Sequence, residues 1–135
     1  MQTQIQANVA AKDRDSRAEV YLKFLNAADE FRNADDALIA KVKSPTFTGS
    51  LSADQDPLKT WNSARSAYRD ALNSVYVYGT AAAWHSASRL AAVLPSTGDN
   101  VTVGHNNAEF EKDYAAFLNV LCRDANASLP SQCRR

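Results

Sequence analysis

The feature that most constrains this chain is a long segment without any helix-breaking residue. From Thr3 to Lys43 there is no proline and no glycine. Apolar side chains recur through the segment mostly every three or four residues, at Tyr21, Phe24, Leu25, Ala28, Phe31, Leu38 and Val42. This spacing predicts one amphipathic helix over 3–43. Ser44-Pro45 ends the helix, because the residue before a proline is pushed out of the helical region.

The beginning of this helix differs from the rest. Lys12 to Arg17 carries no apolar stripe, although Ile5 and Val9 lie about one turn apart. We therefore expect packing to start near Ala18, with residues 1–17 as a helical extension or linker. One interpretation is a solvated or frayed segment, since isolated helices of this length are marginal in water. The other is a surface that joins two copies in an isologous antiparallel homodimer.

A second helix is predicted over 57–94. Asp56-Pro57 supplies an N-cap and a proline at the first helical position, and Pro95 follows the end. The apolar stripe consists of Trp61, Ala64, Tyr68, Ala71, Leu72, Val75, Gly79, Ala82, Ser86, Leu90 and Val93. Gly79 costs about 1 kcal/mol of helix propensity relative to alanine. A packing reason for this glycine is therefore expected.

A third, shorter helix is predicted over 106–126, beginning with a capping-box-like pair, Asn106 and Glu109. Residues 127–135 follow it as a C-terminal tail. These elements predict an all-α fold, an up-down-up antiparallel three-helix bundle in which the second helix touches both others. The 135 residues hold only four glycines and four prolines, too few for a turn-rich all-β fold, and suit one domain over 1–135.

Charge and hydropathy exclude two classes of partner. The 15 basic and 15 acidic side chains cancel, whereas a nucleic-acid surface needs a basic excess. The most apolar stretch, Val75 to Trp84, is about ten residues, which is too short to span a membrane. The first residues also lack the apolar run of a secretory signal. We expect a soluble chain that binds no nucleic acid and does not insert into a membrane.

The residues that could support catalysis do not form a motif. His85 and His105 lie in different predicted elements, and neither glycine-rich phosphate loops nor nucleophile motifs occur. His105 and Glu109 could offer two metal ligands, but zinc needs a third or fourth. Asp35-Asp36 has the appearance of a solvated helix face. We expect no enzyme, no metal site and no cofactor, with His105 facing solvent near a helix cap.

The only two cysteines, Cys122 and Cys133, lie on either side of the Leu129-Pro130 turn. A disulfide between them would fasten the tail to the third helix and imply an oxidising compartment. The alternative is a pair of free thiols.

Aromatic residues supply the best sequence argument for an interaction surface. Tyr76, Tyr78 and Trp84 flank the main apolar stripe of the second predicted helix. Tyrosine and tryptophan are enriched in protein interfaces. The alternative is that the neighbouring helices cover them.

Three segments carry a resemblance to a group of proteins: Arg17–Phe31, the small-residue helix around Gly79, and Tyr114–Leu118. They resemble uncharacterised small helical proteins of actinobacteria and their phages. Many of those carry an N-terminal membrane helix before the long helix, which this sequence lacks. The resemblance implies no catalytic residues.

We therefore expect a non-enzymatic protein-interaction module, the soluble part of a membrane-tethered regulatory or phage–host factor, with a protein partner that the sequence does not name. The alternative is a bundle that senses a small molecule or a metal in a pocket between helices, near Trp61, Tyr68 and Phe117.

Overall fold

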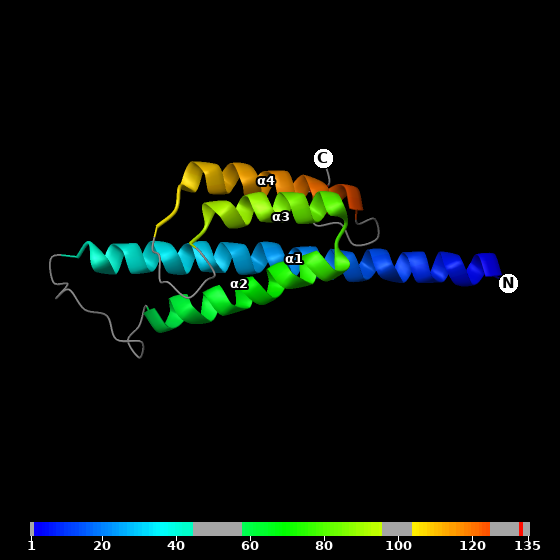
Figure 1. The fold of residues 1–135 in the computed structure, drawn as a ribbon, viewed down its shortest axis with the longest axis horizontal. Helices are drawn as coiled ribbons and strands as arrows, with labels where there is room; N and C mark the ends of the chain where they lie inside the picture. The colour runs from blue at the N-terminus through cyan, green and yellow to red at the C-terminus, as the bar shows by residue number, and fades with distance from the viewer. Residues whose placement is uncertain (1, 45–57, 96–103, 125–132, 134–135) are drawn as a thin grey trace.

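The computed structural model describes residues 2–44, 58–95, 104–124 and 133, with side chains from Arg17 onward. It contains four helices in this part of the chain: α1 (Gln2–Val42), α2 (Leu58–Tyr78), α3 (Ala81–Val93) and α4 (Asn107–Asp124). Successive helices run in opposite directions (Figure 1). The predicted all-α class is confirmed, and the predicted C-terminal tail lies outside the described residues except for Cys133.

The prediction of a three-helix bundle is wrong. The helix predicted over 57–94 is two helices, because the chain leaves the helical path at Gly79 and Thr80 and reverses direction. Thr80 has an extended backbone and acts as the N-cap of α3, since its side chain accepts a hydrogen bond from the Ala83 amide at 3.1 Å. The observed fold is an up-down-up-down arrangement of four helices.

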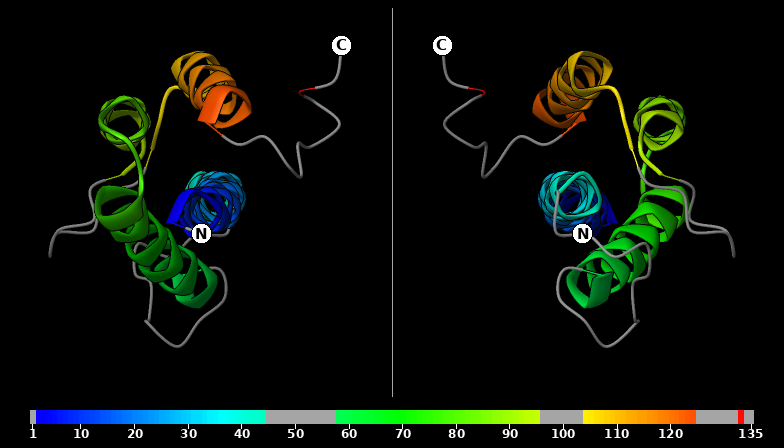
Figure 2. Two further views of the ribbon diagram at one scale, coloured as in Figure 1. Left: turned by 90° about the vertical axis from the view of Figure 1, so that its right-hand side faces the viewer. Right: turned by 90° about the vertical axis from the view of Figure 1, so that its left-hand side faces the viewer.

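Buried side chains from all four helices form one core, and Figure 2 shows how the helices are arranged. α1 packs most extensively against α2 and also contacts α4, whereas α3 packs against α4 and touches α2. The segment predicted as one second helix does contact both others, but it does so through two helices, because α2 packs against α1 and α3 packs against α4. The first turns of α1 extend beyond the ends of the other helices (Figure 1).

Aromatic rings fill the centre of this core. Phe24 packs against Tyr68 and Phe117, with ring centroids 5.5 and 4.8 Å apart. Phe31 packs against Trp61 and Tyr68 at 5.5 and 5.6 Å. Burying such large apolar side chains contributes roughly 1.5–3 kcal/mol each, so these rings dominate the packing of α1 against its neighbours. Of the described side chains, the first buried one along the chain is Ala18.

Over the residues that the structure describes, no helix is both long enough and apolar enough to cross a membrane.

Candidate functional site

The most exposed large apolar side chains of the described residues lie together at the end of α2. Tyr76, Val77 and Tyr78 are 66%, 65% and 61% exposed. Tyr76 contacts the half-buried Trp84 of α3 edge-on, with ring centroids 4.9 Å apart. We call these four residues the aromatic patch. Sequence reasoning names three of them and misses Val77, although its place between two tyrosines in an apolar run marks it.

Gly79, the residue after this patch, is required by close packing. Its amide donates to the Val75 carbonyl oxygen at 2.8 Å and completes the last turn of α2. A Cβ at position 79 would lie 2.5 Å from that same oxygen and 3.3 Å from Cε1 of Tyr21. The Val75 carbonyl oxygen and the Tyr21 ring cannot move far enough to make room for this Cβ without strain. The predicted packing reason for Gly79 is therefore confirmed.

A hydrogen-bonded cluster of Tyr21, Thr80 and Asp124 holds the reversal between α2 and α3. The Thr80 hydroxyl donates to Oδ2 of Asp124 at 2.8 Å, and the Tyr21 hydroxyl donates to the same oxygen at 3.1 Å. The Thr80 amide donates to the Tyr21 hydroxyl at 3.1 Å. Asp124 thus places a carboxylate near the N-terminus of α3, where the helix dipole favours negative charge. We call these residues the Thr80 cluster.

Titration of the Tyr21 hydroxyl reflects this setting. Burial raises the pKa of Tyr21, hydrogen bonds from Thr80 offset part of that rise, and the Asp124 carboxylate adds to it. Tyr21 therefore remains a neutral donor to Asp124 at ordinary pH, which keeps α1 joined to α3 and α4.

A second polar cluster is centred on Asp35, whose side chain is fully buried. It includes residues just before α4, and α4 begins at the end of the bundle opposite the reversal between α2 and α3 (Figure 1). Oδ1 of Asp35 accepts from Nε1 of Trp61 at 2.9 Å, and Oδ2 accepts from the Gly104 amide at 3.1 Å. Nδ1 of His105 lies 2.6 Å from Oδ2. We call these four residues the Asp35 cluster. The expectation that Asp35 faces solvent is wrong, because three donors from distant segments replace its water.

The expectation of a solvent-facing His105 is wrong for the same reason, since its side chain is as fully buried as that of Asp35. Nε2 of His105 lies 2.8 Å from Oδ1 of Asn107 and 3.2 Å from Oδ1 of Asp36. Both ring nitrogens therefore face acceptors, and both can donate only in the imidazolium form. Asp35 and Asn107 therefore engage both ring nitrogens, and the histidine offers no free nitrogen to a metal or a substrate.

Backbone conformation explains part of the same cluster. Gly104 has a φ of 119°, in the region that favours glycine, and this conformation directs its amide at Asp35. The predicted cap of the last helix is also present, because Oδ1 of Asn106 accepts from the Glu109 amide at 3.1 Å. Glu109 therefore belongs to a helix cap. No group of three or more metal-ligating side chains occurs within the described ranges.

The residues expected near an interhelical pocket lie inside the packed core. Trp61, Tyr68 and Phe117 have no exposed surface and pack against the rings of α1. The Tyr68 hydroxyl has no hydrogen-bond partner among the described groups. Burial raises the pKa of this hydroxyl far above its ordinary value. An unpaired buried hydroxyl lowers the stability of the fold, and the packing of the Tyr68 ring offsets that loss.

The two cysteines are joined in the structure. Cys122, in the last turn of α4, forms a disulfide with Cys133, and their Cα atoms are 5.6 Å apart. Cys122 and Cys133 both pack against the core from its edge. The disulfide joins residue 133 to α4 at Cys122, which is two residues before Asp124 of the Thr80 cluster. His85, the other histidine, is exposed on α3.

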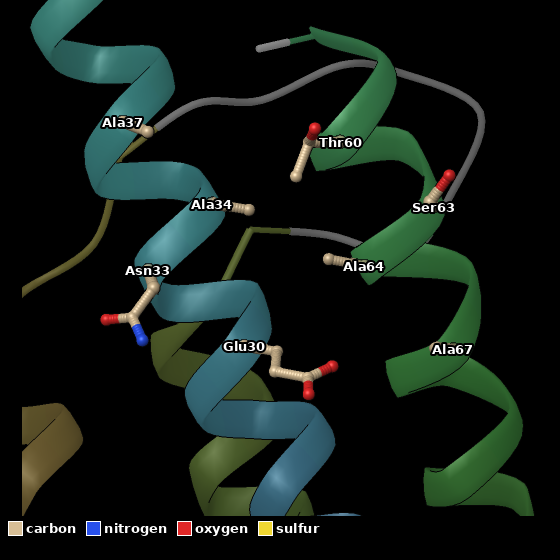
Figure 3. Close-up of a pocket in the computed structure, with 8 residues that line it drawn as sticks. All are labelled: Glu30, Asn33, Ala34, Ala37, Thr60, Ser63, Ala64 and Ala67. Atoms are coloured by element: carbon tan, nitrogen blue, oxygen red, sulfur yellow. The ribbon is translucent and has the colours of Figure 1, made fainter. Parts of the chain in front are cut away.

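A shallow apolar groove runs along the outer side of α1 and α2 (Figure 3). Its first part has a volume of about 490 Å³, with Ala34 facing Thr60 and Ala64 across the groove and Glu30 reaching from α1 towards α2. A second part of about 440 Å³ continues towards Glu19 and shares Glu30 and Ala67 with the first. In Figure 3 the other helices lie behind this surface. The groove is therefore on the side of the bundle that α3 and α4 leave uncovered.

No family model, no curated protein and no solved structure matches this chain.

Proposed function

We propose that this protein is a non-enzymatic interaction module that binds a protein partner through the aromatic patch. One observation carries the proposal. Three consecutive large side chains, Tyr76, Val77 and Tyr78, are each more than three-fifths exposed at the end of a helix. Large apolar side chains gathered on a surface mark interaction sites more often than isolated ones do.

The support around the patch favours binding with little rearrangement. Gly79 packs tightly against Val75 and Tyr21, and Thr80 is held by two other helices. The patch therefore lies on a fixed part of the bundle, so less conformational entropy is lost when it is covered. Tyrosine rings suit such a site because they offer a large apolar area together with a hydroxyl at the rim.

The core aromatic residues and the Asp35 cluster are less suited to catalysis or to binding a small ligand. Trp61, Tyr68 and Phe117 are fully buried and pack against phenylalanine rings of α1 in the core. His105 uses both ring nitrogens inside the Asp35 cluster. The resemblance to membrane-tethered helical proteins adds a proposed setting, in which the bundle is the part of a regulatory or phage–host factor that meets its partner away from the bilayer.

The test compares two valines at opposite ends of the bundle. Val77→Asp places a charge within the aromatic patch, and Val42→Asp places the same charge at the last residue of α1, where Val42 is 39% exposed. Both substitutions add an acidic group to the last turn of a helix and leave the buried core intact. We expect affinity purification from the native host to lose its partner with Val77→Asp and to keep it with Val42→Asp. Equal recovery with both variants would contradict the proposal.

A thermal-shift screen tests the alternative function. A metabolite or metal ion that raises the melting temperature of the wild type and of Val77→Asp equally would favour a sensing bundle over the aromatic patch.

A further inference from the structure

The disulfide between Cys122 and Cys133 lies next to the residues that hold the aromatic patch. Cys122 belongs to the last turn of α4, and Asp124, the last residue of that helix, follows two positions later. The chain has two cysteines, so its thiol chemistry consists of this one disulfide and the dithiol that reduction would give. Both cysteines are only partly buried, at the edge of the core, where a thiol reagent has access to them.

The centre of the core does not depend on this bond. Its aromatic rings come from α1, α2 and α4 and pack against one another. The disulfide joins two positions 11 residues apart, and residue 133 lies outside the four helices. Breaking the bond therefore leaves the contacts among the helices in place. Its effect should be local and should fall on the last turn of α4.

Asp124 connects this turn to the aromatic patch. Its Oδ2 accepts from the Thr80 hydroxyl at 2.8 Å and from the Tyr21 hydroxyl at 3.1 Å. The same Thr80 hydroxyl accepts from the Ala83 amide at 3.1 Å, and the Thr80 carbonyl oxygen accepts from the Trp84 amide at 3.0 Å. The first turn of α3, which carries Trp84 of the patch, is therefore held through Thr80 by the last residue of α4.

We propose that the disulfide is a redox switch for the aromatic patch. A thiolate of a dithiol reductant attacks one sulfur, the S–S bond breaks, and a mixed disulfide forms, which the second thiol of the reductant then resolves. The protein gains two thiols and the reductant leaves as a disulfide, so two electrons and two protons pass to the protein. With residue 133 released, the last turn of α4 frays, Asp124 no longer holds Thr80, and the first turn of α3 opens.

The order of the patch does not depend on a partner, whereas the consequence for binding rests on the proposed function. An ordered surface loses less conformational entropy on binding than a mobile one. The oxidised chain is therefore the form that binds, and reduction releases the partner.

Iodide quenching of tryptophan fluorescence tests the switch in the full chain without a partner. Of the two tryptophans, Trp61 has no exposed surface, so iodide reaches only Trp84, which is half-buried in the patch. Dithiothreitol, a dithiol, should raise the quenching constant by about twofold as the first turn of α3 opens. The double variant Cys122→Ser with Cys133→Ser should show the raised constant with or without dithiothreitol.

Two substitutions in α4 test the route through Asp124. Asp124→Ala keeps the disulfide but removes the acceptor for Thr80, so its oxidised form should already show the raised constant, and dithiothreitol should change it no further. The matched control is Asp113→Ala, which removes a carboxylate about three turns earlier and should respond to dithiothreitol as the wild type does. Circular dichroism checks that each variant keeps its helices. A wild type whose quenching is unchanged by reduction, or an Asp124→Ala variant that still responds, would overturn the proposal.

Affinity purification without reductant separates this inference from the proposed function. The serine double variant should recover about fivefold less of the partner that the wild type recovers and Val77→Asp loses, because a mobile patch must be ordered again on binding. Equal recovery by the wild type and the serine variant would overturn the effect on binding and leave the proposed function in place. Equal recovery by the wild type and Val77→Asp would contradict the proposed function, and the quenching result would still decide whether the switch exists.

Discussion

The two polar clusters of this bundle each hold a carboxylate between helices, but the two carboxylates differ in how deeply they are buried. At one end Asp35 has no exposed surface and depends on donors from three positions far along the chain. At the other end Asp124 is half-buried and accepts from Thr80 and Tyr21 while it keeps contact with solvent. This difference in burial determines how much stability the fold loses when a carboxylate loses a hydrogen-bond partner. A fully buried charge has no water to replace a lost hydrogen bond, whereas a half-buried one does.

The contrast also bears on how each end is used. The Asp35 cluster joins the C-terminal half of α1 to α2 and to residues 104 and 105 just before α4, and the side-chain nitrogen and oxygen atoms of Asp35, Trp61 and His105 all have partners. The Thr80 cluster joins three helices next to the exposed aromatic patch.

The largest expected effect comes from removing the buried carboxylate. Asp35→Ala should lower the free energy of unfolding by about 3–5 kcal/mol, because Trp61, Gly104 and His105 lose their shared buried partner. Urea denaturation followed by circular dichroism measures it. Asp36→Ala is the control, since Asp36 is 47% exposed and should cost less than about 1 kcal/mol. Equal losses for the two neighbours would mean that burial does not distinguish them.

The next prediction concerns the disulfide, which lies close to the Thr80 cluster and not to the Asp35 cluster. Reducing the Cys122–Cys133 disulfide, with a sequence separation of 11, should cost about 2–3 kcal/mol, because the unfolded chain regains the entropy of an open loop. Hydrogen exchange should locate the loss of protection in the last turn of α4 and around Thr80, and leave the amide of Trp61 protected. A variant with serine at both positions should not respond to reductant. Uniform loss across both ends would contradict a local role for the disulfide.

A smaller effect tests the cap of α3. Thr80→Val keeps the shape of the side chain but removes the hydroxyl that serves Ala83 and Asp124, and it should cost about 1–2 kcal/mol. Thr80→Ser keeps the hydroxyl and should stay within about 0.5 kcal/mol of the wild type. Thermal unfolding of the three proteins measures the difference. If valine and serine were equally tolerated, packing alone would hold the reversal between α2 and α3.

The smallest effect compares two buried tyrosines. Tyr21→Phe removes a hydroxyl with hydrogen-bond partners and should cost about 1 kcal/mol, whereas Tyr68→Phe removes one without a described partner and should be neutral or stabilising. The same pair predicts a dependence on pH. Burial raises the pKa of Tyr68, so above its ordinary value of 10.0 the unfolded chain loses a proton that the folded chain keeps. This stability is present below pH 10 and falls as pH rises, by about 1.4 kcal/mol per pH unit for one tyrosine.

Denaturation at pH 9 and pH 11 checks this sign. The wild type should lose more stability over that interval than Tyr68→Phe, which has no phenol to titrate at this position. The same loss in both proteins would assign the alkaline effect to other groups.

Several elements could be predicted from sequence because their signals are local. The Pro45 stop places the end of α1 near the observed Val42, and Asn106 places the cap of α4. The exposed tyrosines of the aromatic patch could be singled out because they flank the buried stripe of their own helix. The reversal at Gly79 and Thr80 could not, since apolar residues continue at helical spacing across it. Only the burial pattern shows the change of phase, because Ala83 and Ala87 are buried where Ala82 was expected to be.

The sequence by itself determined which segments are helical, where α1 ends and where α4 begins, because periodicity, caps and prolines act within a few residues of one another, but it did not show the break between α2 and α3. Position 35 already lies on the stripe of Phe31 and Leu38, and this spacing is the signal that could have identified Asp35 as buried. Only the tertiary structure decided that a carboxylate can occupy it. The donors that make its burial possible come from residues 26, 69 and 70 positions away, and no local rule brings them together. A buried charge is stable only where the whole fold supplies its partners.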